Sequence, residues 1–254
     1  MKRKIQTITT LIIAAITLCG TPLNTQAAEA ARQVFWTDGN SQVSYSVNAK
    51  TSDVVKIALQ LFAHDMQTIT GRAAKEKANA PLQIFQMDQL SNKEFAILEK
   101  YNLPIHHFIT KKESFYIATR NGKLFVVGSD ARGTAYGILE LSRMAGVSPW
   151  TDWGDIIPER KSTLSLPDGF LTRQWPSVEY RGVFINDEDW SSRVWAKNIS
   201  GKHAKDGEMG PPFYRRLFTL LLRLRANAFW PAMHEGTTAF FKVKGNRELA
   251  DSCD

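Results

Sequence analysis

The sequence predicts an α+β domain followed by the first strand–helix units of a parallel barrel or a doubly wound sheet. Strand-like and helix-like segments mix without regular order up to residue 147. A stretch rich in proline and tryptophan then interrupts the pattern. From residue 178 the order becomes strand, polar loop, helix, strand, which is typical of sheets with parallel strands. We therefore divide the chain into residues 1–28, 29–147, 148–177 and 178–254.

Residues 1–28 have the pattern of a secretory signal peptide. Three cations at positions 2–4 precede an apolar run over 11–18, and Gln-Ala-Ala, which ends in two small residues, follows at 26–28. The run is too short for a helix that spans a bilayer core of about 30 Å, so no stable membrane span is expected. Cys19 would suit a lipoprotein, but the preceding leucine does not. We predict cleavage and a secreted or periplasmic bacterial protein, with lipidation as the weaker alternative.

Charge and cysteine content exclude several classes of protein. The formal net charge of +7 includes the three cations of the predicted signal peptide. The other basic residues are scattered, and no basic run alternates with aromatics as in a groove for single-stranded nucleic acid. The basic excess would suit an anionic sugar polymer, although solvated surface charge explains it more simply. Only Cys253 remains after cleavage, so neither a disulfide framework nor a zinc site is predicted.

The amino-terminal domain is predicted from hydrophobic spacing, capping residues and turns. Apolar residues recur at helical spacing over 53–70, and Gly71 ends this helix. Asn121 and Gly122 suit a tight hairpin turn because both tolerate positive φ. The predicted elements are strands at 42–47 and 82–87, helices at 53–70, 91–101 and 130–145, and a hairpin of 115–119 with 124–127.

The loop before the last of these helices invites a phosphate-binding interpretation. Residues 128–133 form a glycine-bounded loop between a strand and a helix. However, the Walker spacing and the dinucleotide-binding glycine motif are both absent. We interpret the loop as a turn in which Asp130 caps the helix. Gly133, Ala135 and Gly137 would then form a face that can lie close to a sheet.

Residues 148–177 are predicted to be a linker that crosses the surface. They hold four prolines and no sustained periodicity. Trp150, Trp153 and Trp175 could stack on the C–H faces of sugar rings, because a flat aromatic side chain offers apolar area there. Packing between domains is the favoured role for each of the three.

The segment after residue 178 places polar side chains where α/β proteins bind ligands. A short strand over 180–185 is followed directly by Asn186, Asp187 and Glu188. Because loops converge on a shared crevice at the carboxyl ends of buried parallel strands, we interpret these residues as a candidate site. Carboxylates there can bind sugar hydroxyls, hold a divalent cation or act as acid or base, and their spacing does not choose among these roles.

A second strand is predicted to bring further candidates to the same edge. This strand ends at Trp230, and His234 and Glu235 follow shortly after. If the two strands are parallel neighbours with a right-handed crossover, these side chains share a rim with Asp187.

An amphipathic helix over 212–226 is predicted between the two strands. Leucines gather on one of its faces, and its four arginines, which include Arg223 and Arg225, are expected to face water. The sequence ends within another helix-like run, 246–254, without a closing turn, which we interpret as truncation of a longer protein.

Two motifs carry a resemblance to a known enzyme family. Residues 181–190 read Arg-Gly-Val-Phe-Ile-Asn-Asp-Glu-Asp-Trp, and residues 222–234 read Leu-Arg-Leu-Arg-Ala-Asn-Ala-Phe-Trp-Pro-Ala-Met-His. Both resemble the start of the catalytic barrel in the α-glucuronidases of glycoside hydrolase family 115. Residues 128–137 and 146–150 are similar to the amino-terminal domain of that family. The resemblance extends over most of 30–254 and is strongest after residue 178.

The resemblance implies a fold and an activity. The fold is an α+β amino-terminal domain, like the small domain before several glycosidase barrels, followed by the first βα units of an incomplete (β/α)8 TIM barrel. A whole barrel takes about 250 residues, so the barrel part would be truncated. The implied activity is hydrolysis, with inversion, of the α-1,2 bond that joins glucuronic acid or its 4-O-methyl ether to xylan. The implied substrate is glucuronoxylan or a xylo-oligosaccharide, no organic cofactor is implied, and a homodimer is allowed.

The matched positions imply roles for the candidate residues. Asn186 and Asp187 would line the uronic-acid pocket, and Trp230 would form its wall. Three neighbours have weaker support as substrate-binding residues: Glu188, His234 and Glu235. The general acid of the family would lie beyond residue 254, so we expect this chain alone to be inactive.

Three alternatives remain open at this point. The first is another exo-glycosidase, because the two-domain layout is shared among such enzymes. The second is a non-catalytic carbohydrate-binding protein that recognises sugars through exposed tryptophans. The third is a genuine short product with a structural role, which is less favoured than truncation.

Overall fold

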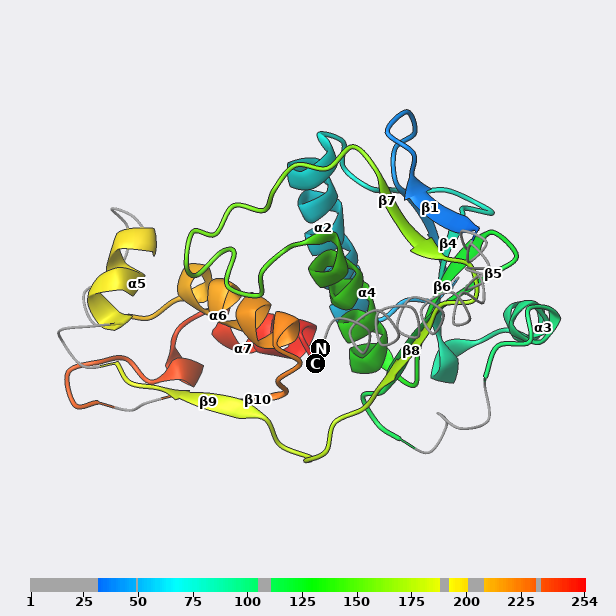
Figure 1. Cartoon of the computed structure of the whole chain (residues 1–254). Helices are drawn as coiled ribbons and strands as arrows, with labels where there is room; N and C mark the ends of the chain where they lie inside the picture. The colour runs from blue at the N-terminus through cyan, green and yellow to red at the C-terminus, as the bar shows by residue number, and fades with distance from the viewer. Residues whose placement is uncertain (1–31, 49, 105–110, 188–191, 201–207, 232–233) are drawn as a thin grey trace, which may run out of the picture. The chain divides into compact units, whose positions relative to one another are not determined.

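A six-stranded mixed sheet forms the centre of the amino-terminal part of the chain in the computed structural model (Figure 1). The strand order is β3-β2-β4-β6-β5-β8. Strands β3, β2, β4 and β6 are mutually parallel, whereas β5 runs antiparallel to both of its neighbours.

The structure describes most of the chain after residue 31, and this part forms one compact unit from Gln33 to Asp254. The predicted signal peptide and Glu188 lie outside the described residues. Those residues are 32–48, 50–104, 111–187, 192–200, 208–231 and 234–254.

The helices and strands have the following bounds. The strands are β1 Gln33–Thr37, β2 Ser44–Val47, β3 Lys75–Glu76, β4 Leu82–Gln86, β5 Phe115–Arg120, β6 Lys123–Gly128, β7 Leu164–Pro167, β8 Leu171–Gln174, β9 Gly182–Ile185 and β10 Ala228–Pro231. The α-helices are α2 Asp53–Thr70, α3 Asn92–Lys100, α4 Ala131–Ala145, α5 Ser192–Ser200, α6 Pro211–Arg223 and α7 Asn246–Ser252. The 3-10 helices are η1 Met87–Gln89 and η3 Phe240–Lys242. Among the helices of the described residues, none combines the length and apolar character needed to cross a membrane.

Side chains alternate across the sheet and fill a separate core on each face. In β5, Phe115 and Ile117 pack with the side chains of α2 and α4, which lie side by side (Figure 1). Tyr116 and Ala118 point the other way and pack with α3 and the residues that follow it. The period of two along the strand therefore gives each face of the sheet its own core, covered by α2 and α4 on one side and by α3 with the residues after it on the other.

The predicted end of α2, the predicted start of α3 and the predicted hairpin turn are confirmed, although Ser52 at the start of α2 makes no side-chain capping bond. α2 has the predicted bounds, and Gly71 ends it in the left-handed conformation with φ of 80°. A capping box formed by Ser91 and Glu94 begins α3. The hairpin turns at Asn121 and Gly122, whose φ angles are 51° and 76°. Local sequence signals were sufficient here because each element is specified by residues within a few positions of its ends.

Helix α4 lies close against the sheet, as the glycine spacing predicts. A Cβ atom on Gly137 would stand 2.6 Å from Cγ1 of Val126, and one on Gly133 would stand 2.2 Å from the carbonyl oxygen of Ser114. The carboxylate of Asp130 accepts a hydrogen bond of 2.7 Å from the backbone N–H of Gly133. The loop before α4 is thus a capped strand-to-helix turn, as the sequence indicates.

Residues 148–177, predicted to be a linker, contribute two strands. β7 pairs with β1 in an antiparallel ribbon, and β8 forms the edge of the six-stranded sheet beside β5. Both strands are only four residues long, and each pairs with a strand distant in the sequence. Local periodicity cannot reveal strands of this kind.

The carboxyl-terminal part is built on a parallel pair of strands, β9 and β10, with Phe184 opposite Trp230. One face of the pair, which carries Ile185 and Phe229, packs against a core formed mainly by α6, with contributions from α5, η3 and α7. The other face is open: the side chains of Phe184 and Trp230 are 58% and 71% exposed. The prediction that β9 is a buried strand is therefore wrong for the described residues. They contain no closed barrel.

The four arginines of the predicted helix 212–226 do not all face water, which corrects the sequence prediction. Arg223 is 8% exposed and donates two hydrogen bonds, of 2.8 and 2.9 Å, to the carboxylate of Asp65 in α2. Arg225 contacts the carboxylate of Glu140 in α4 at 2.6 Å. Amphipathic spacing missed both pairs because the acidic partners lie more than 80 residues away in the sequence.

We predict that Arg223→Ala strongly destabilises the protein, because it leaves the Asp65 carboxylate buried without its cation. The expected loss in unfolding free energy is about 3–5 kcal/mol, measured by urea denaturation. Arg247→Ala is the matched control, since its ion pair with Asp251 is exposed and should contribute no more than about 0.5 kcal/mol. Equal losses for the two variants would contradict a stabilising role for the buried pair.

Candidate functional site

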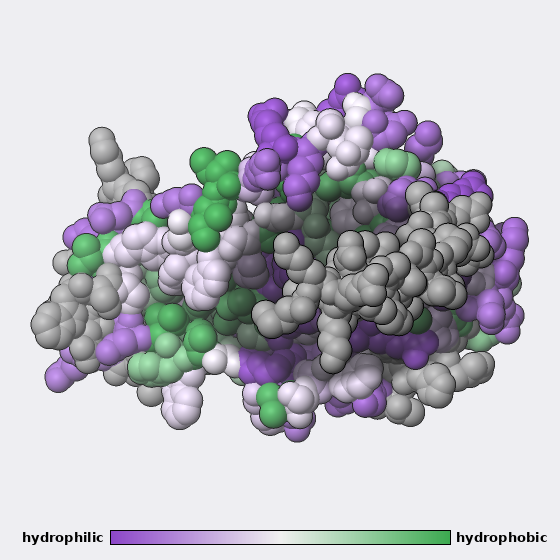
Figure 2. Space-filling model, in the orientation of Figure 1, coloured by the Kyte–Doolittle hydropathy of each residue, from purple (hydrophilic) through white to green (hydrophobic). Residues whose placement is uncertain are grey.

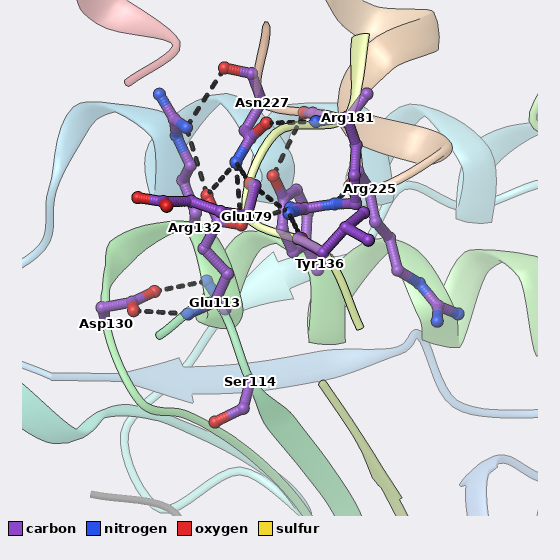
Figure 3. Close-up of polar contacts among 12 residues, drawn as sticks. Glu113, Ser114, Asp130, Arg132, Tyr136, Glu179, Arg181, Arg225 and Asn227 are labelled. Atoms are coloured by element: carbon purple, nitrogen blue, oxygen red, sulfur yellow. Dashed lines mark hydrogen bonds and ion pairs between the residues drawn. The ribbon is translucent and has the colours of Figure 1, made fainter. Parts of the chain in front are cut away.

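The amino ends of β9 and β10 are tied to the α+β part by a polar junction, which we define as Glu113, Arg132, Glu140, Arg181, Arg225 and Asn227. All of these residues except Glu140 are labelled in Figure 3. Arg181 and Asn227 stand just before β9 and β10. The carboxylate of Glu113 contacts Arg132 at 3.2 Å, is hydrogen-bonded to Arg181, and accepts bonds of 3.0 and 3.1 Å from the amide of Asn227. The side-chain oxygen of Asn227 accepts a bond of 2.9 Å from the backbone N–H of Arg181.

Glu113 is held in its charged form by this arrangement. Burial raises the pKa of its carboxyl group, but hydrogen bonds from Arg181 and Asn227 and the charge of Arg181 outweigh burial and bring the pKa below its ordinary value of 4.5. Its backbone N–H also donates a bond of 2.6 Å to Asp130. Both oxygens of the carboxylate are occupied by partners from the protein, so Glu113 has a structural role in this state.

Glu140 completes the junction on α4. Its carboxylate contacts Arg225 at 2.6 Å and Arg143 at 2.7 Å, and accepts a bond of 3.3 Å from Gln174 in β8. Burial raises the pKa of Glu140, and the hydrogen bond from Arg143 together with the charge of Arg225 outweighs it, so the pKa is lowered. The junction is thus a saturated network, and the end of the strands where it lies offers few free polar groups.

Asp187 lies beyond the opposite, carboxyl end of β9 and connects the loops that follow both strands. It is 5% exposed. Its carboxylate accepts a bond of 2.5 Å from the hydroxyl of Thr237 and one of 3.2 Å from the backbone N–H of His234. The structure therefore brings together Asp187 and the His234 loop, as the predicted rim requires.

The Asp187 side chain lies on the side of the strands that α6 covers. The pKa of Tyr214 in α6 is raised above its ordinary value, first by burial and then by the negative charge of Asp187. Trp230 instead packs edge-to-face on Phe184, with ring centroids 6.4 Å apart, on the open face. Of the two residues predicted to line one pocket, Asp187 is therefore buried near α6, whereas Trp230 is exposed on the open face.

The other predicted site residues are at the surface. Asn186, His234 and Glu235 are exposed, and the backbone carbonyl oxygen of Asn186 accepts a hydrogen bond from the hydroxyl of Ser192 at the start of α5. Glu188 lies outside the described residues. Asn186 and Trp230 therefore present accessible polar and aromatic surface near the carboxyl ends of the strands, whereas Asp187 is buried and bonded to Thr237 and His234.

Of the three tryptophans in residues 148–177, Trp153 packs against other aromatic side chains, and Trp150 and Trp175 are exposed. Trp153 packs between Trp195 of α5 and Phe213 of α6, with centroids 4.9 and 6.1 Å away. Trp150 is 46% exposed, and the ring of Trp175 lies under the ammonium group of Lys111 at 4.1 Å. In Figure 2, hydrophobic residues reach the surface in the half of the view that holds α5, α6 and the loop between α4 and β7.

Sequence reasoning missed a cavity of about 500 Å³ at the free edge of β10. It is lined mainly by apolar side chains, including Phe229, Phe241 and Cys253, with Arg132 and Asp254 at the polar end. Burial raises the pKa of the Cys253 thiol. The apolar residues of α6 and the preference of α7 for a helix could be recognised in the sequence, but the cavity depends on how these helices pack beside β10.

The comparisons with known proteins agree with the pattern of the strand ends. Residues 173–254 match the family model described as Glycosyl hydrolase family 115. The chain is also similar to a solved family GH115 4-O-methyl-α-glucuronidase with specificity for decorated arabinogalactans, at 43% identity and a TM-score of 0.76. That similarity covers 84% of this chain and 28% of the solved one, so this chain spans little more than a quarter of its relative.

A more distant similarity concerns the fold alone. A chitobiase from Flavobacterium johnsoniae shares 12% identity with a TM-score of 0.51, over 87% of this chain and 31% of that chain. No curated protein matches this chain.

The depressed pKa values of Glu113 and Glu140 predict a loss of stability in acid. A carboxyl group whose pKa is lower in the folded state stabilises the protein above its unfolded pKa, and this contribution is lost as pH falls through the folded pKa. Glu113→Gln should therefore be less stable than the unchanged protein near neutral pH, and the difference should narrow below pH 4.5. Urea denaturation at several pH values measures this, with the exposed Glu159→Gln as control. A difference that is constant across the pH range would contradict the proposed linkage.

Asp187 is predicted to anchor the loop after β10. Asp187→Ala removes the acceptor for Thr237 and for the N–H of His234, and should cost about 1–3 kcal/mol of unfolding free energy. Thr237→Val removes one of the two bonds and should cost less. Amide hydrogen exchange at His234 should be faster in Asp187→Ala, and unchanged exchange would be inconsistent with this anchor.

Proposed function

Because the chain belongs to glycoside hydrolase family 115, we propose that the complete protein is an α-glucuronidase that removes glucuronic acid or its 4-O-methyl ether from a polysaccharide. The observation that carries this proposal is the 43% identity to a solved α-glucuronidase of that family over 84% of the chain. The match of residues 173–254 to the family model supports it independently, because those residues include both strands and the loops after them.

The proposed reaction is hydrolysis with inversion at the anomeric carbon. Inversion requires one protonated carboxyl group that gives the leaving oxygen its proton and one carboxylate that activates water, held roughly 6.5–9.5 Å apart. Within the described residues, the loops after β9 and β10 offer Asp187 and Glu235. Asp187 is buried and already hydrogen-bonded to Thr237 and His234, which suits a residue that positions the loops better than one that meets water.

We assign contact with the sugar to the exposed residues of the candidate site. Trp230 offers a flat apolar face, which suits the C–H side of a pyranose ring. Asn186 can hydrogen-bond to hydroxyl or carboxylate oxygens, and His234 and Glu235 stand on the loop that Asp187 anchors. Glu188 lies outside the described residues, and substrate binding by Glu188 stays a prediction.

Two polysaccharides are candidates for the substrate. The resemblance in the sequence indicates α-1,2-linked uronic acid on xylan. The similar solved enzyme has specificity for decorated arabinogalactans, which favours an arabinogalactan as the second candidate. The discriminating experiment incubates the complete protein with glucuronoxylan and with an arabinogalactan bearing uronic acid, and measures the uronic acid released. If neither substrate releases glucuronic acid or its methyl ether, the proposed function is wrong.

Trp230→Ala in the complete protein should lower kcat/KM by about tenfold or more, because it removes the aromatic wall offered to the sugar. Trp150→Ala is the matched control, since Trp150 is exposed in the loop between α4 and β7 and should leave kcat/KM unchanged. If Trp150→Ala lowers kcat/KM and Trp230→Ala does not, the proposed aromatic contact with the sugar is not made by β10.

We also predict that the chain of 254 residues releases no glucuronic acid when assayed alone. The sugar-facing side of β9 and β10 is open to water in this chain, and the site loops offer no second carboxylate that is shielded from solvent within the described residues. The same substrates and product assay test this prediction. Turnover by the chain alone would show that the described residues suffice for catalysis.

A further inference from the structure

A second hollow lies in the α+β part, between β1 and the edge strand β3. Its volume is about 640 Å³, within the range of about 300–1,000 Å³ that is usual for small-molecule sites. Its lining comes from β1, the turn that follows it, β2 and residues 75–81. No residue of β9, β10 or the loops after them contributes, so this hollow is separate from the candidate site at those strands.

An exposed aromatic residue forms part of the wall of the hollow. Phe35 is 46% exposed although it belongs to a strand, and its neighbour Trp36 is 5% exposed. The pairing of β1 with β7 shifts register between Phe35 and Thr37, so Trp36 is an extra residue in the strand. In a regular strand, consecutive side chains point to opposite faces, and a bulge interrupts this alternation. Here the consecutive residues Phe35 and Trp36 both line the hollow.

The turn at the rim of the hollow is held by several hydrogen bonds. The carboxylate of Asp38 accepts three hydrogen bonds of 3.0 Å, from the backbone N–H groups of Asn40 and Ser41 and from the hydroxyl of Ser41. Arg72 donates a bond of 2.6 Å to the carbonyl oxygen of Asn40. A ligand would therefore meet a rim that is already ordered, which reduces the entropy lost on binding.

Two lysines in the lining give the hollow a preference for anions. Lys75 and Lys77 line it and are exposed, and neither has an ion-pair partner in the part of the chain that the structure describes. Glu76 stands between them in the lining, but it pairs in register with Tyr45, whose pKa is raised first by burial and then by the charge of Glu76, so the Glu76 carboxylate lies on the other face of β3. The carboxylate of Asp38 faces its own turn, where it accepts the three hydrogen bonds from Asn40 and Ser41. The polar groups of Gln42 and Asn79 stand in the same lining. A flat apolar ring, hydrogen-bonding groups and free ammonium groups are the combination that recognises an acidic sugar.

We propose that this hollow is a second carbohydrate site that holds an acidic glycan chain at a distance from the reacting bond. A sugar ring packs on Phe35, and a uronic-acid carboxylate pairs with Lys75 or Lys77. The choice of an acidic glycan rests on the proposed function, whereas the site itself follows from the bulge, the hollow and the free lysines. Unpaired lysines also protect an edge strand such as β3 from association, so the test must separate the two roles.

The test is binding of glucuronoxylan, arabinogalactan bearing uronic acid, and neutral xylan to the complete protein and to the 254-residue chain, measured by affinity electrophoresis and calorimetry. We expect the acidic glycans to bind and to be released by salt, as charge pairing requires. Phe35→Ala and the double variant Lys75→Ala/Lys77→Ala should each weaken binding to the 254-residue chain about tenfold. Phe95→Ala and Lys93→Ala, at exposed positions of α3, should leave it unchanged. Thermal unfolding of each variant checks that it is folded.

Several results would overturn the proposal. One is that none of these glycans binds to the 254-residue chain, and another is that Phe35→Ala binds as well as the unchanged chain. A third result is that neutral and acidic glycans bind equally well and that replacing the two lysines does not change this binding. The lysines would then serve only to protect the edge strand β3 from association, which contradicts the proposed site. Loss of all binding in Trp230→Ala would place recognition at β10 instead.

The complete protein separates this proposal from the proposed function. On a small aryl glucuronide, which is too short to reach a distant site, Phe35→Ala should leave kcat/KM unchanged, whereas on glucuronoxylan it should raise KM with little change in kcat. If the complete protein has no glucuronidase activity on any substrate, the proposed function is wrong. The binding measurements on the 254-residue chain would still decide whether the hollow is a carbohydrate site.

Discussion

Three acidic side chains with little exposed surface connect the α+β part to the strands β9 and β10. Each comes from the α+β part and pairs with an arginine near one of those strands or at the end of α6. The pairs are Asp65–Arg223, Glu113–Arg181 and Glu140–Arg225. A charge buried without a partner is costly, so separating the two parts would require water to replace every one of these contacts. This accounts physically for residues 33–254 forming one compact unit.

The position of these pairs leaves the two ends of the strands with different chemistry. At the amino ends, Arg181 and Asn227 are fully engaged with Glu113 and with neighbouring carbonyl oxygens. At the carboxyl ends, Asp187 ties the two loops together while Asn186 and Trp230 remain exposed. In barrels built from parallel strands, the amino ends serve stability and the carboxyl ends serve ligand binding. In these two strands, the polar groups at the amino ends are engaged within the protein, whereas exposed polar and aromatic side chains gather at the carboxyl ends.

The sequence was a good guide wherever the signal was local. Helix α2, the capping box of α3 and the turn at Asn121 are each specified by neighbouring residues. Long-range partners were not predictable: β8 pairs with β5 across about 50 residues, and Arg223 finds Asp65 across 158. For the site, the strand-end motifs located Asp187 and His234 on adjoining loops, but a linear pattern could not show that Asp187 is buried beside α6 while Trp230 faces outward.

The junction also determines how two sugar-binding surfaces on one chain would work together. A glycan held at Phe35 gains effective concentration at β10 only if the connection between the surfaces is stiff, since a flexible connection spreads the chain over a large volume. The helices α2 and α4, which carry Asp65 and Glu140, pack on the same sheet that ends at β3, beside the hollow. The acidic anchors and the hollow therefore lie on the same assembly of sheet and helices, and the ion pairs with the arginines connect this assembly to the strands. Weakening a buried ion pair would then reduce the benefit of the second site without altering either surface.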